Sequence, residues 1–131
     1  MRSRLARGSL AFKDVAGRSV YNDGALPGLP MPDSAGTLFE SLLAIMSRLR
    51  SDGGCPWDRE QTRATLKPYL IEEAYEALEA LDGSSSEHIQ EELGDVLFQV
   101  VFHVQLAREA GEFTMADLLA RLNAKMIRRH P

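Results

Sequence analysis

Residues 72–95 read EEAYEALEALDGSSSEHIQEELGD, and the architecture of the chain can be worked out from this segment. It contains two acidic helical segments separated by a short break rich in glycine and serine. Residues three apart on an α-helix project within about 60° of each other, so Glu73 pairs with Glu76, and Glu92 pairs with Asp95. A short connection makes two such helices antiparallel neighbours. The stretch therefore predicts a helical hairpin that carries one pair of acids on each arm.

The spacing along the two arms places the pairs opposite one another. Glu76 and Glu92 each lie six residues from the edge of the break, which puts both at about 9 Å from the turn. Glu73 and Asp95 lie one turn further out, at about 13–14 Å by the same rise. Facing carboxylates repel strongly unless a cation binds between them. The pattern favours Mg²⁺, which is commonly shared between a few carboxylates and substrate phosphates, with Mn²⁺ as a substitute of similar preference.

A solvated acidic helix face is the competing interpretation, and from spacing alone it explains the acids equally well. Two details favour the metal site. Leu93 and Gly94 stand between the last two acids and are typical of a packed interior, where Gly94 permits close helix approach. Few basic residues occupy the i±4 positions that would pair with the four acids.

Upstream of the hairpin the sequence predicts one further helix and the start of the first arm. Thr37 and Glu40 have the form of a capping box, in which both side chains satisfy free amides at a helix start. Two glycines and a proline in residues 51–56 end that helix. The next helical region is expected over about 62–81, and Pro68 predicts that its main helix begins or kinks there.

Downstream, a third helix is expected over 87–110, after a capping box of Ser84 and Glu87. Its centre, residues 96–104, is apolar nearly all round, which predicts burial on several sides and a subunit interface. A fourth helix is expected from Thr114. The sequence therefore predicts an all-α, four-helix-type bundle that assembles as a homodimer or a higher homo-oligomer.

Composition and charge narrow the class of protein. The chain has 131 residues, is 44% hydrophobic and carries a net charge of −4, which fits one globular domain without a dedicated nucleic-acid face. No run approaches the roughly 18 apolar residues of a membrane span. The single cysteine, Cys55, is typical of a reducing compartment and predicts a cytoplasmic protein. Residues 1–36 are rich in arginine, glycine and proline and predict a flexible or loosely docked extension, with the domain at residues 37–131.

A resemblance to a known family emerges from the acids and the stretches around them. Glu72-Glu73-Ala-Tyr-Glu76, followed after 15 residues by Glu92-Leu-Gly-Asp95, resembles the EExxE…ExxD motif of MazG-type nucleoside triphosphate pyrophosphohydrolases. The similarity covers roughly residues 38–131, and it includes the segments 54–62 and 128–131. The larger relatives carry two such domains in tandem, and one is expected here.

The resemblance implies a Mg²⁺-dependent hydrolysis of nucleoside triphosphates to monophosphate and pyrophosphate, in the house-cleaning of nucleotide pools. Glu73, Glu76, Glu92 and Asp95 would be the metal ligands. Glu72 would orient or deprotonate the attacking water, or only support the ligands. The alternatives are a narrow-specificity dUTP or dCTP pyrophosphatase and a non-catalytic helical interaction module.

The resemblance also implies residues that contact the substrate. Lys125, Arg128 and Arg129 would neutralise phosphate oxygens, although they also suit the C-terminal dipole of the fourth helix. Further candidates for substrate contact are Lys67 toward phosphate, Gln61 toward the sugar or base, and Trp57 toward the base. Trp57 has a structural alternative, in which it pins the segment 54–57 against the bundle.

Overall fold

The computed structural model describes residues 34–130, and this part of the chain forms five helices and no strand. The helices are α2 (Ala35–Leu49), α3 (Pro56–Glu60), α4 (Arg63–Asp82), α5 (Ser86–Glu109) and α6 (Met115–Arg129). The predicted all-α class is confirmed. None of these helices is long and apolar enough to cross a membrane. The expected N-terminal extension falls almost entirely on residues 1–33, outside the described part.

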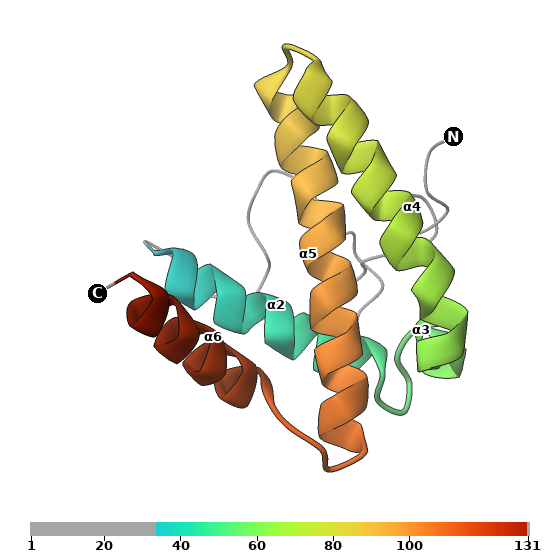
Figure 1. Cartoon of the computed structure of the whole chain (residues 1–131). Coiled ribbons are helices and arrows are strands. Elements are labelled where there is room, and N and C mark those ends of the chain that lie inside the picture. Colours follow the sequence, from blue (N-terminus) through green and yellow to red (C-terminus); the bar gives the residue numbers. More distant parts are fainter. Residues whose placement is uncertain (1–33, 131) are drawn as a thin grey trace.

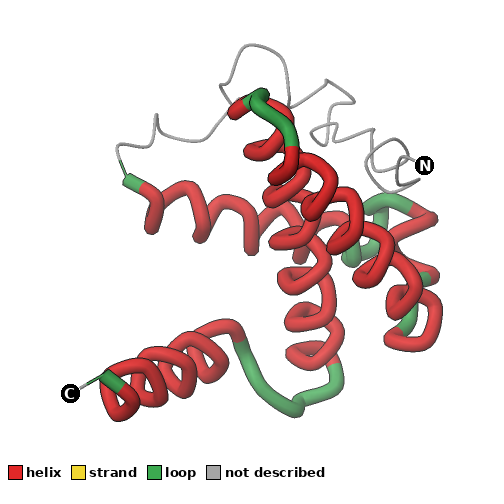
Figure 2. Tube along the Cα trace, turned by 45° about the horizontal axis from the view of Figure 1, so that its top comes forward, coloured by secondary structure: helices red, strands yellow, loops and turns green. Residues whose placement is uncertain are grey.

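Helix α5 is the centre of the fold. It packs against α4 as an antiparallel hairpin and also contacts α2 and α6. Figure 1 shows α4 on one side of α5, whereas α6 and the N-terminal end of α2 extend from the other side. Figure 2 shows the same separation from a second direction. The hairpin predicted from the acidic stretch is therefore the structural axis of the chain.

The first helix starts one turn earlier than the sequence predicts. Ser34 is the N-cap of α2, and its Oγ accepts a hydrogen bond from the amide of Thr37 at 3.2 Å. The predicted capping box at Thr37 and Glu40 is therefore wrong, because Ser34 is an equally good cap and an earlier start adds a helical turn.

Helix α4 runs straight through the position where it was expected to begin. Thr62 caps it, in a capping box with Thr65, and Pro68 is the sixth helical residue. A start at Pro68 is therefore wrong. The missing proline N–H leaves the Ala64 carbonyl without its helical donor. Both residues are exposed, so water can satisfy that carbonyl.

Of the predicted caps of α5 and α6, the first is wrong and the second is confirmed. Ser85, not Ser84, caps α5, with its Oγ accepting from the His88 amide at 3.2 Å. Thr114 caps α6 as predicted, reinforced by the Asp117 carboxylate. Gly111 directly follows Ala110, the C-cap of α5, with a φ of 72°, in the left-handed region that favours glycine.

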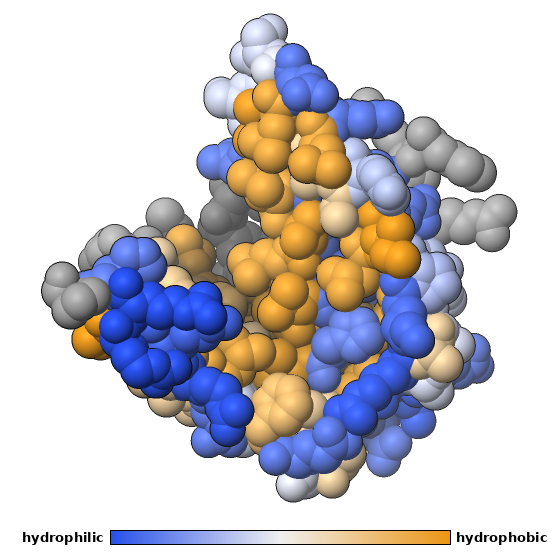
Figure 3. All heavy atoms as spheres, viewed as in Figure 1, coloured by the Kyte–Doolittle hydropathy of each residue, from blue (hydrophilic) through white to orange (hydrophobic). Residues whose placement is uncertain are grey.

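The core is small and draws on every long helix. Its buried members are Met46, Leu66, Val101, Phe102, Val104 and Met115. The apolar centre of α5 is only partly covered within the chain, because Leu97 is 43% and Val100 is 37% exposed. Figure 3 shows apolar side chains gathered over α4 and α5 on this face. The prediction that residues 96–104 are buried on several sides is therefore confirmed except for one stripe, because the buried residues Gln99, Val101, Phe102 and Val104 point in different directions around α5.

Candidate metal and nucleotide site

Three of the four predicted metal ligands come together between α4 and α5. One carboxylate oxygen from each of Glu73, Glu92 and Asp95 lies within 4.8 Å of the other two. Glu73 is 0% and Glu92 is 5% exposed. The residues come from two helices joined by a three-residue connection, so the hairpin register alone brings them together. We call these three residues the carboxylate cluster.

Glu76 lies beside the carboxylate cluster but outside its tightest group. Its side chain is 8% exposed, and it interacts with the carboxyl group of Glu92 through its charge and a side-chain hydrogen bond. Its charge contributes to the raised pKa values of Glu92 and Asp95, so its carboxylate faces the same space. All four predicted ligands therefore lie in one region, with three acids close together and Glu76 beside them.

The electrostatics of the cluster favour a bound cation. Burial, followed by the charges of Glu92, Glu91 and Glu76, raises the pKa of Asp95 to about 6. Burial and the charge of Glu76 also raise the pKa of Glu92. The imidazole of His88 lies beside Glu92, with Nδ1 at 3.8 Å from Oε1. A hard divalent ion with oxygen ligands would relieve this repulsion, and the donor set fits Mg²⁺ or Mn²⁺.

Glu72 lies next to the cluster on α4 and is half-buried. It is rotated by about 100° from Glu73 on the same helix, so it borders the cluster without joining the group of three. This position is compatible with a role toward water or with support of the ligands.

The predicted phosphate contacts do not gather at the cluster within one chain. Arg128 and Arg129 are exposed, and Lys125 is partly exposed, all on α6. Figures 1 and 2 show the C-terminal end of α6 pointing away from α4. Lys67 is exposed on α4 and is rotated by about 120° from Glu73 around that helix.

Gln61 serves the loop before α4. Its Nε2 donates to the Trp57 carbonyl at 2.9 Å, and its Oε1 accepts from Thr65 Oγ1 at 2.9 Å. Both ends of the carboxamide are therefore engaged in local structure, which is a role that the sequence did not indicate.

Trp57 packs against the core and the start of α4. Its ring meets Tyr69 edge-on, with centroids 5.9 Å apart and an interplanar angle of 75°. The half-buried ring also packs against the core cluster. This arrangement agrees with the structural alternative for Trp57, and the remaining exposed surface leaves contact with a base open.

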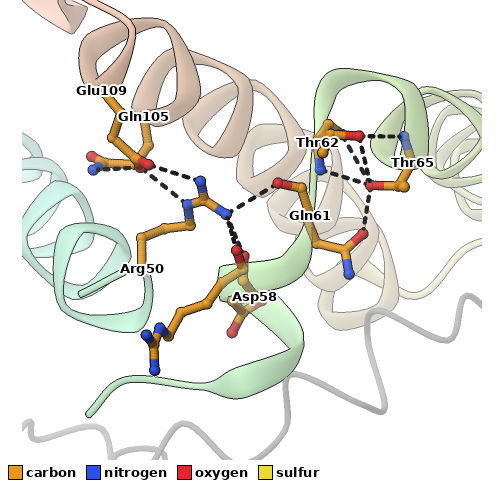
Figure 4. Close-up of polar contacts among 8 residues, drawn as sticks. Arg50, Asp58, Gln61, Thr62, Thr65, Gln105 and Glu109 are labelled. Carbon is orange, nitrogen blue, oxygen red and sulfur yellow. Dashed lines mark hydrogen bonds and ion pairs between the residues drawn. The ribbon is translucent and has the colours of Figure 1, made fainter. Parts of the chain in front are cut away.

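A half-buried arginine that sequence reasoning missed holds the segment before α4 in place. Figure 4 shows Arg50 between α5 and the segment 58–61. Its Nε and Nη2 donate to both oxygens of Glu109, at 3.0 and 2.7 Å. Its Nη1 donates to the carbonyls of Asp58, Arg59 and Gln61, at 2.7, 3.0 and 3.1 Å. We call these five hydrogen bonds the Arg50 clamp.

The side chain of Asp58 is enclosed by the same loop and is fully buried. Burial raises its pKa, whereas a hydrogen bond from the Cys55 thiol and the Arg50 charge lower it. The only signal in the sequence was a charged residue at each edge of a glycine-rich loop. That signal does not reveal which carbonyls the arginine would meet.

Comparison with known proteins assigns this arrangement to a family. Residues 61–131 match the family model described as the MazG nucleotide pyrophosphohydrolase domain, and this match covers α4, the carboxylate cluster, α5 and α6. The chain belongs to the MazG nucleotide pyrophosphohydrolase domain family. The resemblance drawn from the acidic motif is therefore confirmed.

Relatives of this MazG domain extend the match upstream. A Thermotoga maritima protein named nucleoside triphosphate pyrophosphohydrolase/pyrophosphatase MazG is 61% identical over 97 residues, which cover 74% of this chain and 38% of that protein. An Escherichia coli nucleoside triphosphate pyrophosphohydrolase is 50% identical over 93 residues, 70% of this chain and 35% of that protein. The uncharacterized protein YabN of Bacillus subtilis is 48% identical over 93 residues, 71% of this chain and 19% of that protein. The chain thus spans well under half the length of these three relatives.

Proposed function

We propose that this chain hydrolyses nucleoside triphosphates to nucleoside monophosphate and pyrophosphate in a Mg²⁺-dependent reaction, and that it serves the house-cleaning of nucleotide pools. The observation that carries the proposal is the carboxylate cluster, in which three acids from two helices place oxygens within 4.8 Å. Family membership and the names of the Thermotoga maritima and Escherichia coli relatives support the reaction.

The residues of the cluster fit a hard cation. Glu73, Glu92 and Asp95 would hold it, and Glu76 would complete the ligand set or hold a second ion. A bound Mg²⁺ supplies positive charge to phosphate oxygens and helps to ionise the attacking water. Mn²⁺ is expected to substitute, because it prefers the same oxygen donors.

The other residues position the reactants. Glu72, at the border of the cluster, is placed to accept a proton from water or to orient it. Lys125, Arg128 and Arg129 would neutralise the phosphate oxygens that gain charge as pyrophosphate leaves. Because α6 extends away from α4 within one chain, these three residues serve a site only if α6 moves or a second copy brings it there.

We further propose that the chain forms a homodimer through the apolar face of the hairpin. This face contains large exposed apolar residues of α4 and α5, namely Ile71, Tyr75, Leu78, Leu93, Leu97 and Val100. Figure 3 shows their helices forming a continuous apolar band. Monomeric proteins rarely expose such contiguous patches, and a second copy would bury the exposed stripe of Leu93, Leu97 and Val100 on α5. Light scattering should give twice the chain mass, and Leu97→Glu should give the chain mass; a wild-type monomer at micromolar concentration would refute the dimer.

The reaction is tested by pyrophosphate release from a panel of canonical and modified NTPs and dNTPs, with and without Mg²⁺. Glu73→Gln should abolish release, because it removes a charged ligand of the cluster with little change in shape. Glu79→Gln is the matched control, since Glu79 is an exposed acid on the same helix. Release from dUTP or dCTP alone would favour the narrow-specificity alternative. Mg²⁺ binding without release would indicate a non-catalytic interaction module.

We expect a cytoplasmic protein without dedicated nucleic-acid binding, because the chain is acidic overall and holds one unpaired thiol, Cys55. Fractionation of cells that produce the protein with its native sequence tests this expectation.

A further inference from the structure

Gln99 is a fully buried polar residue that the proposed reaction does not use. Its side chain is 0% exposed on α5. Within residues 34–130, neither its Oε1 nor its Nε2 has a hydrogen-bond partner. A carboxamide offers one acceptor oxygen and two donor hydrogens, and burying such a group without partners is unfavourable. A buried amide of this kind calls for a ligand or a bound water.

The position of Gln99 relates it directly to the carboxylate cluster. It lies one turn beyond Asp95, about 6 Å further along α5. Around the helix axis it projects within about 40° of Asp95 and about 20° of Glu92. Gln99 therefore continues the row of cluster ligands along the same face of α5.

The opposite arm supplies aromatic surface at the same level. Helices α4 and α5 are antiparallel, and Glu73 faces Asp95 within the cluster. One turn back along α4 from Glu73 therefore reaches the level of Gln99, and that position is Tyr69. Tyr69 packs edge-on against Trp57, at 5.9 Å between centroids. Beyond the carboxylates, the hairpin thus presents an amide on α5 and the ring of Tyr69 on α4, against which Trp57 of α3 packs.

We propose that Gln99 recognises the nucleobase of the nucleotide whose phosphates are held at the carboxylate cluster, an inference that rests on the proposed function. In a nucleotide the sugar and base follow the α-phosphate, so they fall on the turn next to the ligands. The amide's neighbouring donor and acceptor match a base edge, as in bidentate glutamine–adenine pairs. An aromatic ring beside it suits the face of any base.

A ligand has no harder path to Gln99 than a metal ion has to the carboxylate cluster. Glu73 is equally buried, at 0% exposure. A route that admits an ion to Glu73 therefore passes within one helical turn of Gln99. The opening that the reaction needs is also the opening that base recognition needs.

The test replaces the amide by an apolar group of similar size. Gln99→Met should reduce the ratio of kcat/KM between the best and the worst base by at least about fivefold, the low end for a bidentate amide–base contact. Gln90→Met is the matched control, because Gln90 is exposed on the same helix and should leave the ratio unchanged. The melting temperature of Gln99→Met should hold or rise, since an unpartnered buried amide is replaced by an apolar group.

A second readout needs neither metal nor turnover. Trp57 is the single tryptophan of the chain, so its fluorescence reports binding of AMP, GMP, CMP and UMP in the presence of EDTA. The wild type should discriminate among the four bases, and Gln99→Met should not. The inference would be overturned if Gln99→Met kept the base preference of the wild type in both assays. It would also be overturned by a fall of more than about 10 °C in the melting temperature of Gln99→Met, which would show that the amide stabilises the fold. Base-dependent binding through Gln99 without pyrophosphate release would refute the proposed reaction and leave the recognition intact.

Discussion

Removal of the Arg50 clamp should destabilise the protein more than any exposed charge does. The Arg50 side chain is 11% exposed and ties the end of α2 to α5 and to the loop before α4. In Arg50→Met, the part-buried carbonyls of Asp58 and Gln61 lose their donor. Each loss should cost about 1–2 kcal/mol. The carboxylate of Glu109 is 39% exposed and is hydrated again in the variant, so loss of the Arg50–Glu109 ion pair adds little to the destabilisation.

The expected total is a loss of about 3 kcal/mol in the free energy of unfolding, out of the 5–15 kcal/mol that is usual for a domain. For about one hundred ordered residues, this corresponds to a fall of roughly 10–20 °C in melting temperature. Urea denaturation and thermal unfolding, both at fixed protein concentration, measure the two quantities.

Arg59→Met is the control for the Arg50 clamp. Arg59 pairs at 3.2 Å with Asp52, which is fully exposed, and its own backbone carbonyl stays in place. We expect a change within about 0.5 kcal/mol. A loss below about 1 kcal/mol for Arg50→Met, or an equal loss in both variants, would refute the assignment of the clamp as a principal stabilising contact.

Three further predictions concern the cluster and the α5–α6 turn. Burial and the neighbouring carboxylates raise the pKa of Asp95 from 3.8 to about 6, so between these pH values the metal-free fold holds a proton that the unfolded chain has released. Its stability should fall as pH rises between these values, by up to about 3 kcal/mol. Asp95→Asn should reduce this dependence in urea titrations at several pH values, and the part that comes from the raised pKa of Glu92 should remain. Mg²⁺ at a hundred times its dissociation constant should stabilise the wild type by about 2.7 kcal/mol, whereas calorimetric melting of Glu73→Gln should show no shift. Gly111→Ala should cost about 1–2 kcal/mol in denaturant midpoints, because the φ of 72° is unfavourable for alanine, although no atom lies within 4 Å of the added methyl group.

The hairpin and its acids could be predicted from sequence because both are local. The spacing of Glu73, Glu92 and Asp95 fixes their faces on two helices, and the short connection fixes which turns meet. Family resemblance then identified the chemistry of the acids. Helix starts were less certain, since Ser34 and Thr37, or Ser84 and Ser85, are chemically equivalent caps. Tertiary packing decides between such neighbours.

Features that depend on distant contacts could not be predicted in this way. The Arg50 clamp joins residues 50, 58–61 and 109, and no local pattern shows that the last carbonyls of α3 and the carbonyl of Gln61 will converge on one arginine. Gln61 was expected at the substrate, yet its amide is engaged with Trp57 and Thr65. Nothing in the spacing of Lys125, Arg128 and Arg129 shows that α6 leaves α5 in a direction away from α4. These placements follow from how whole helices pack.

The hairpin also has a consequence for how the protein folds. The main helix contacts are between α4 and α5, which are neighbours in sequence joined by a tight connection, so the entropy lost on closing this loop is small. Contacts of short sequence separation form fast, and the hairpin is therefore expected to form ahead of the docking of α2 and α6. The carboxylates of α4 and α5 are then brought together early on the folding pathway, when little other structure exists to offset their repulsion. A cation present at that stage would offset this repulsion, and refolding in Mg²⁺ should be faster than in EDTA.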